Sequence, residues 1–192
     1  MTEIELKARV QDRDALIKKL NSLADFKGHI IRNDEYFGLK NSDGVFLKNK
    51  IRIRKESCDG SEKILLTYKH KEEHIKDKNL MEVNDEKECI ISDDAALKTF
   101  LKDFGFELSL KKHKDVLLWT YEEASLELCS VPPLGDFLEI EILSPEDSPK
   151  IREAARKKLE EILSLCGIPE DRIENRYYSD MLREAAAEDS KA

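Results

Sequence analysis

The stretch Glu3-Ile4-Glu5-Leu6-Lys7-Ala8-Arg9-Val10 decides the fold of this chain. In an extended strand successive side chains point to opposite faces, so the charged residues of this stretch share one face and the aliphatic residues share the other. Glu3 and Glu5 would then lie about 7 Å apart and repel each other by about 2 kcal/mol at an effective dielectric constant of about 20. Solvent or a cation must offset this repulsion. Considered alone, the stretch is most simply an amphipathic strand with a solvated face.

Further stretches show the same alternation, and their charges are sorted by sign. Phe137-Leu138-Glu139-Ile140-Glu141-Ile142 again sets two glutamates against aliphatic residues. Lys50-Ile51-Arg52-Ile53-Arg54 places only cations on its charged face, Leu65-Leu66-Thr67-Tyr68-Lys69 ends in a cation, and Lys112-His113-Lys114 carries two more. The acidic strands therefore lie toward the two ends of the chain, with the basic strands between them.

The composition is that of a polar but folded domain. The chain has 192 residues, of which 39% are charged and 40% are hydrophobic. This length suits a single domain, which we place at residues 1–182, followed by a frayed Ala- and Glu-rich tail at 183–192. The net charge of -8 argues against a nucleic-acid or membrane-surface binder, because both kinds of binding depend on a dominant basic surface.

Nothing in the sequence indicates export or membrane insertion. The cysteines, Cys58, Cys89, Cys129 and Cys166, are widely spaced and form no CxxC pair, so we expect reduced thiols rather than a zinc site. The N-terminus lacks a signal-peptide pattern, and no apolar run approaches the roughly 20 residues needed to span a bilayer. We therefore expect a cytoplasmic protein.

Apolar periodicity and turn residues predict an antiparallel sheet with few helices. The expected strands cover residues 3–10, 29–38, 45–55, 62–70, 80–91, 107–118, 125–131 and 136–143. The expected helices begin after Asp12 or Asp14, after Ser92 or Asp93, after Ser148 and from Pro169. The mixed-charge run 71–78 has no apolar periodicity, which predicts an exposed and mobile loop.

These elements predict an α+β fold, an eight-stranded antiparallel β-barrel with helices packed on the outside. If the charged strand faces pointed outward, the amphipathic helices would have no apolar surface to cover. If the aliphatic faces point outward instead, the charged faces line an interior tunnel. We favour the tunnel. The alternative is a barrel closed by internal salt bridges that binds no ligand.

A tunnel with glutamates on one side and cations on the other suits a ligand that carries several negative charges together with a divalent cation. Carboxylate oxygens are preferred ligands of Mg²⁺ and Mn²⁺, while Arg and Lys bind phosphate oxygens. The pattern therefore predicts a polyphosphate site with Mg²⁺ or Mn²⁺ as cofactor.

An ordered set of motifs resembles the CYTH family, the triphosphate tunnel metalloenzymes. This family includes class IV adenylate cyclases, thiamine triphosphatases and inorganic tripolyphosphatases. The resemblance spans about residues 1–180 and rests on Glu3-Ile4-Glu5-Leu6-Lys7, Asp34-Glu35-Tyr36-Phe37, Arg52-Ile53-Arg54, Thr67-Tyr68-Lys69, Lys112-His113-Lys114 and Leu134-Gly135-Asp136-Phe137-Leu138-Glu139-Ile140-Glu141. Any one motif is weak, whereas the ordered set is specific.

The resemblance implies roles for particular residues. The implied metal ligands are Glu3, Glu5, Glu139 and Glu141, with Glu127 as a further candidate. The implied triphosphate-binding residues are Lys7, Arg52, Arg54, Lys69, Lys112 and Lys114, with Arg176 as a further candidate. Catalysis would be metal-assisted, and no separate base is assigned.

The chain departs from the family pattern at two positions. The family usually has Asp, a metal ligand, where this chain has Cys129, and Glu127 lies two residues back on the same strand face. A shift of about 7 Å along the strand is large for metal geometry, so Glu127 is only a candidate replacement. Lys114 stands where the family has Arg, and Lys is a point charge where Arg offers a planar fork.

The resemblance implies a divalent-metal-dependent enzyme that acts on a small-molecule triphosphate. The length and the ending Glu174–Leu182 look most like the class IV adenylate cyclases, which convert ATP to cyclic AMP and pyrophosphate. One alternative is a triphosphatase acting on thiamine triphosphate or inorganic tripolyphosphate. Another is a catalytically weak module that binds a nucleotide or polyphosphate, and Cys129 keeps this alternative open. We expect no nucleic-acid or membrane partner, and a homodimer is left open.

Overall fold

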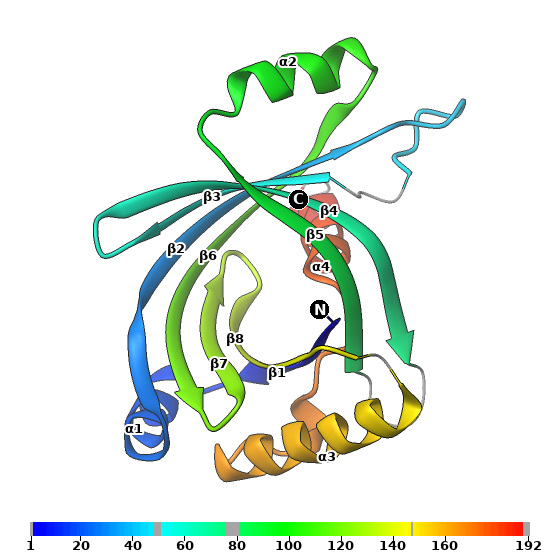
Figure 1. Ribbon diagram of the computed structural model, residues 1–192. Coiled ribbons are helices and arrows are strands. Elements are labelled where there is room, and N and C mark those ends of the chain that lie inside the picture. The colour runs from blue at the N-terminus through cyan, green and yellow to red at the C-terminus, as the bar shows by residue number, and fades with distance from the viewer. Residues whose placement is uncertain (1, 48–50, 76–80, 147, 190–192) are drawn as a thin grey trace.

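The fold is described by a computed structural model that covers residues 2–47, 51–75, 81–146 and 148–189. Within these residues the strands are β1 (Thr2–Val10), β2 (Asp25–Gly38), β3 (Ile51–Cys58), β4 (Ser61–Ile75), β5 (Met81–Ile91), β6 (Glu107–Tyr121), β7 (Ala124–Val131) and β8 (Gly135–Ser144). All neighbouring pairs are antiparallel, and β1 pairs with both β5 and β8, so the order β1-β5-β4-β3-β2-β6-β7-β8 closes into a barrel (Figure 1). The predicted α+β fold with an eight-stranded antiparallel barrel is confirmed.

The α-helices of the described residues are α1 (Arg13–Leu23), α2 (Ala95–Asp103), α3 (Pro149–Leu165) and α4 (Tyr178–Asp189), and a short 3-10 helix covers Glu170–Arg172. Two of them begin as the sequence predicts. The Asp12 carboxylate accepts a hydrogen bond from the Ala15 N–H at 2.9 Å, and the Ser148 hydroxyl accepts one from the Ile151 N–H at 3.3 Å. Each bond satisfies a backbone donor that has no partner inside the helix.

The outward faces of β1, β7 and β8 are aliphatic and are covered by α1 and α3 (Figure 1). This main core contains Ile4, Leu6, Leu126, Leu138 and Ile140 from the strands and Leu16, Leu20, Leu159 and Ile162 from the helices. Burying one such side chain completely contributes about 1.5–3 kcal/mol, so the aliphatic faces are held outward and the charged faces inward. A second apolar cluster joins α2 to the outward side of β3, through Leu101 and Ile53.

The C-terminal helix α4 packs on a different part of the barrel. Its residues Tyr178 and Met181 belong to one buried apolar cluster with Phe137 and Cys129, which have the same strand parity as the inward-facing glutamates. The Tyr178 ring meets the Phe137 ring edge-on, with centroids 5.0 Å apart. Helix α4 therefore borders the barrel interior rather than its outer surface.

Three local predictions are wrong. Residues 71–75 continue β4 rather than forming a loop, because their backbone pairs with β5 from Lys71 opposite Asp85 to Ile75 opposite Met81. Backbone pairing with a neighbouring strand outweighs the missing apolar alternation there. Residues 45–47 precede β3 instead of belonging to it, and residues 183–189 are helical rather than frayed. Residues 48–50, 76–78 and 190–192 lie outside the described ranges.

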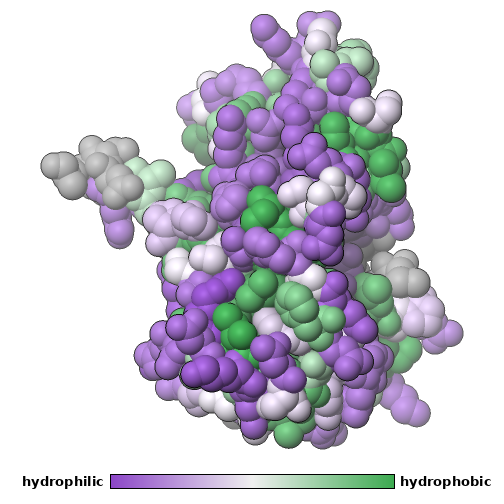
Figure 2. Space-filling model, turned by 90° about the vertical axis from the view of Figure 1, so that its left-hand side faces the viewer, coloured by the Kyte–Doolittle hydropathy of each residue, from purple (hydrophilic) through white to green (hydrophobic). Residues whose placement is uncertain are grey.

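The surface agrees with the polar composition. Figure 2 shows hydrophilic residues over most of one face, with apolar residues in small groups among them. None of the helices in the described ranges combines the length and the apolar character needed to cross a membrane. The four cysteines are free thiols in the structure.

Candidate active site

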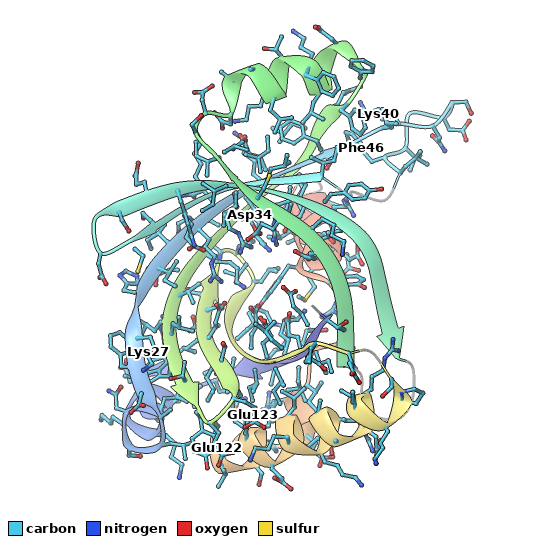
Figure 3. The ribbon with its side chains drawn as sticks, viewed as in Figure 1. Lys27, Asp34, Lys40, Phe46, Glu122 and Glu123 are labelled. Atoms are coloured by element: carbon cyan, nitrogen blue, oxygen red, sulfur yellow. The ribbon has the colours of Figure 1, made fainter. Side chains whose placement is uncertain are left out.

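Charged side chains from all of the described strands line a cavity of about 660 Å³ inside the barrel. Figure 3 shows Asp34 at the upper end of the barrel, while Lys27, Glu122 and Glu123 lie toward its lower end. The strand alternation brings the following predicted residues to the cavity: Glu3, Glu5, Lys7, Arg52, Arg54, Lys69, Lys112, Lys114, Glu127, Glu139 and Glu141. Arg176 does not line it.

One side of the cavity concentrates negative charge. The pairing of β1 with β8 sets Glu5 directly opposite Glu141, and like charges in such a cross-strand pair repel. Burial, followed by the charges of Glu3, Glu127 and Glu139, raises the pKa of Glu141 to about 7. Burial and the neighbouring Glu86 also raise the pKa of Glu3. This cluster of Glu3, Glu5 and Glu141, the acidic cluster, is an environment that a cation would stabilise.

Glu139 joins the acidic cluster to the basic side. The Lys114 ammonium donates to Glu139 Oε2 at 2.6 Å. Burial raises the pKa of Glu139, but the adjacent Lys114 charge outweighs it and lowers that pKa to about 2, so the carboxylate is ionised. Its other oxygen, Oε1, is buried and has no hydrogen-bond partner among the described residues. An unpartnered, buried, anionic oxygen beside further carboxylates fits a hard divalent cation such as Mg²⁺ or Mn²⁺.

The opposite side of the cavity carries cations that buried acids hold in place. Asp34, whose side chain is fully buried, accepts two hydrogen bonds from Arg54, at 2.7 and 3.0 Å, and pairs with Lys112 at 3.2 Å. Glu86 similarly pairs with Arg52 and with Lys69, both at 3.0 Å. These acids fix the cationic groups in the lumen before any ligand binds.

Three lysines surround the Tyr178 ring at the edge of the cavity. The ammonium groups of Lys7, Lys114 and Lys112 lie 4.4, 5.3 and 5.4 Å from the ring centroid. Lys7 also donates to the backbone carbonyl of Arg176 at 2.8 Å. The start of α4 thus helps to position the lysines of β1 and β6.

Comparison with known proteins decides the family. The family model for the CYTH domain matches residues 1–178. This chain belongs to the CYTH family. Its members are adenylate cyclases or triphosphatases, which bind triphosphate substrates and use divalent metals. No curated protein matches the sequence.

Solved structures share the CYTH fold. Protein PH1819 from Pyrococcus horikoshii is 27% identical, with a TM-score of 0.78 over 95% of this chain and 99% of that one. A proposed adenylate cyclase from Vibrio parahaemolyticus is 16% identical, with a TM-score of 0.74 over 95% and 98% of the two chains. A proposed adenylyl cyclase from Hippeastrum with dominant triphosphatase activity is 18% identical, with a TM-score of 0.65 over 95% of this chain and 96% of that one.

Two candidate residues of this CYTH chain form ion pairs that the sequence pattern does not indicate. The Arg176 guanidinium pairs with Glu174 at 2.9 Å and Glu184 at 3.2 Å and is half-exposed, so its phosphate-binding role stays a prediction. Glu127 does line the cavity, but Arg32 binds both of its oxygens, at 2.6 and 2.8 Å. The partners of Arg176 are close in the sequence, two and eight residues away, whereas Arg32 and Glu127 are 95 residues apart.

Several cavity residues of the CYTH tunnel were missed. Arg32 and Glu56 share strand parity with Asp34 and Arg54, so strict alternation would have found them. Tyr178 and Asp180 come from α4, and no periodicity in the sequence indicates that this helix reaches the lumen. The sequence therefore locates the strand contribution far better than the helical one.

The raised pKa of Glu141 predicts pH-dependent metal binding. Below about pH 7 this carboxyl carries a proton that a bound cation must displace, whereas above about pH 7 the carboxylate is already ionised. We expect the Mn²⁺ affinity to fall by up to about tenfold for each pH unit below 7 and to stay constant from about pH 7.5 to 8.5. Titrations of the free Mn²⁺ signal by electron paramagnetic resonance (EPR) would measure this. An affinity that is unchanged from pH 5.5 to 8.5 would contradict the prediction.

Proposed function

We propose that this protein is a divalent-metal-dependent enzyme of the class IV adenylate cyclase type, which converts ATP to cyclic AMP and pyrophosphate inside the tunnel. One observation carries the proposal. A single cavity sets a cluster of carboxylates with raised pKa values against cations that buried acids hold in place. Such a cavity suits a ligand that brings both a metal ion and a chain of phosphates.

The proposed metal ligands are Glu3, Glu5, Glu139 and Glu141, and Mg²⁺ or Mn²⁺ would supply charge neutralisation and Lewis acidity when bound. The proposed triphosphate-binding residues are Lys7, Arg52, Arg54, Lys69, Lys112 and Lys114. Acidic partners already orient all of these side chains except Lys7, which donates to the Arg176 carbonyl, so they need little rearrangement to bind phosphate oxygens. The enclosing barrel and α4 shield the bound phosphates from bulk water, which strengthens these contacts.

The same tunnel suits either of two displacements at phosphorus. In the cyclase reaction the ribose 3′-hydroxyl attacks the α-phosphorus, a new O–P bond closes the ring, and pyrophosphate leaves with the bonding electrons. In the triphosphatase reaction water attacks the terminal phosphorus, and orthophosphate and a diphosphate are formed. Both need positioning and charge stabilisation more than a covalent protein intermediate. The triphosphatase is our second candidate, and the Hippeastrum protein supports keeping it.

Product analysis separates these reactions. The purified chain is incubated with Mg²⁺ or Mn²⁺ and, separately, with ATP, thiamine triphosphate and tripolyphosphate, and the products are resolved by chromatography. Cyclic AMP with equimolar pyrophosphate is the expected result. Orthophosphate as the main product would replace the cyclase proposal with the triphosphatase. No metal-dependent product from any of the three would overturn both and favour a binding module.

Removing Arg54 tests the phosphate-binding role. We expect Arg54→Ala to weaken tripolyphosphate binding about 10- to 100-fold and AMP binding less than threefold, because a forked guanidinium donates to oxygens of a phosphate chain. Isothermal titration calorimetry without divalent metal would measure both affinities. Lys55→Ala is the matched control, since its half-exposed side chain lies next in β3 on the opposite face. Equal losses for the two ligands would argue against this role.

A further inference from the structure

The carboxylates of the cavity differ in what neutralises them. Among the described residues, neither Glu3 nor Glu141 forms an ion pair within 4.0 Å. Glu127, in contrast, receives Arg32 Nη1 on one oxygen at 2.6 Å and Arg32 Nη2 on the other at 2.8 Å. A bidentate pair of this kind occupies both carboxylate oxygens with directed, charge-assisted hydrogen bonds.

Arg32 is also held from its other side. Its Nε donates to Glu56 Oε2 at 2.7 Å, and Lys63 lies 2.8 Å from the other oxygen of Glu56. Only 12% of the Arg32 side chain is exposed. These contacts use three of the five N–H groups of a guanidinium, which leaves two with which Arg32, a cavity-lining residue, can bind a ligand oxygen.

Glu127 belongs to a group that resembles a second cation site. One ligand atom from each of Glu127, Cys129 and Glu139 lies within 4.8 Å of the others. However, Lys114 Nζ is 2.6 Å from Glu139 and 4.0 Å from Glu127. Two anionic carboxylates are therefore already balanced by two protein cations, Arg32 and Lys114.

Cys129 adds no charge to this group. The thiol is fully buried and donates to the backbone carbonyl of Glu127, with an Sγ to oxygen distance of 3.6 Å. A hard cation prefers oxygen ligands to sulfur. It would also have to displace Arg32, and a buried cation that loses its partner strongly destabilises a protein.

We propose that the tunnel holds one divalent cation, bound at Glu3, Glu5, Glu141 and the open Oε1 of Glu139, and that Arg32 is the fixed cation at Glu127. In this arrangement Arg32 binds a phosphate oxygen with its two remaining N–H groups. The inference rests on the proposed function, since it names the cation count and a further substrate-binding residue of the same site.

Counting bound Mn²⁺ tests this inference. The full chain, without triphosphate, is titrated with Mn²⁺ at pH 8 and the free ion is measured by EPR. We expect one Mn²⁺ per wild-type chain, affinity at least tenfold weaker in Glu141→Gln, and affinity within twofold of wild type in Glu127→Gln. Two Mn²⁺ per wild-type chain, or loss of Mn²⁺ in Glu127→Gln, would overturn the inference.

Arg32→Gln tests the arginine itself. Without the guanidinium, the carboxylates of Glu127 and Glu56 lose their shared cation, so we expect a second Mn²⁺ equivalent and a KM for ATP raised at least tenfold. If Arg32→Gln binds only one Mn²⁺ per chain and has a wild-type circular dichroism spectrum, the proposed role of Arg32 is overturned. If this variant does not fold, the numbers of Mn²⁺ ions bound by the wild type and by Glu127→Gln still test the single-cation site.

The proposed number of bound cations and the proposed reaction can be overturned independently of each other. One Mn²⁺ per chain without turnover of any triphosphate would overturn the proposed function and keep the single-cation site. Metal-dependent turnover with two Mn²⁺ per chain would keep the function and overturn the single-cation site.

Discussion

Glu141→Gln is expected to abolish metal-dependent turnover, with a loss of roughly 1,000-fold or more in kcat/KM, because the Lewis-acid contribution of a bound metal amounts to several kcal/mol. Glutamine keeps the shape of the side chain but removes the anionic oxygen. Glu5→Gln, at the residue directly opposite in the β1–β8 pair, is expected to behave in the same way. Product formation with Mg²⁺ and with Mn²⁺ would be measured for both variants.

The same substitution is expected to stabilise the metal-free protein. The pKa of Glu141 is raised to about 7 from the ordinary 4.5, so the folded state holds more protons than the unfolded state between those values and its stability falls as the pH rises through them. At pH 8 the ionised carboxylate costs about 2 kcal/mol after allowance for solvent screening, and glutamine removes this cost. Urea unfolding of the metal-free chain would measure the gain.

Loss of activity together with a gain in stability distinguishes a cation site from ordinary structural damage. Glu123→Gln is the matched control, because this exposed residue lies at the turn between β6 and β7, outside the barrel (Figure 3). Glu123→Gln should change neither the metal-dependent turnover nor the free energy of unfolding. Retained turnover in both Glu5→Gln and Glu141→Gln would remove the metal assignment, and a destabilised Glu141→Gln would contradict the electrostatic account of the acidic cluster.

Asp34→Ala is expected to produce the largest loss of stability, about 3–5 kcal/mol, since it leaves Arg54 and Lys112 as buried cations without their shared carboxylate. Burial raises the pKa of Asp34, but the adjacent Lys112 and Arg54 charges outweigh it and hold that pKa well below the ordinary 3.8. Its stabilising contribution is therefore complete above about pH 4 and is lost as the pH falls below that value.

Urea unfolding at pH 7 would measure the loss for Asp34→Ala. Asp25→Ala is the matched control in the same strand, because 85% of its side chain is exposed, and it should change the free energy of unfolding by less than about 0.5 kcal/mol. Asp34→Asn should lie between the two, since it keeps the shape but not the charge. Equal stabilities for Asp34→Ala and Asp25→Ala would show that Asp34 does not hold the cationic side of the cavity together.

Particular strands show how far prediction from the sequence reaches. The alternation in Glu3–Val10 and Phe137–Ile142 predicted which residues enter the lumen, and every strand residue assigned to the site does line the cavity. The prediction failed in the run 71–75, where strand pairing rather than side-chain pattern decides the conformation. The sequence also did not indicate that Arg176 lies outside the cavity lining, where its guanidinium pairs with Glu174 and Glu184.

The sequence by itself determined the barrel and the two faces of its strands, because a period of two residues and the burial of aliphatic side chains are local and additive effects. Only the tertiary structure decided which acid meets which cation. Arg32 and Glu127 are 95 residues apart, and Lys7 and the Arg176 carbonyl are 169 residues apart. No local sequence pattern can therefore predict either contact. Ion pairs inside a barrel depend on the register and curvature of strands that meet only after the sheet closes.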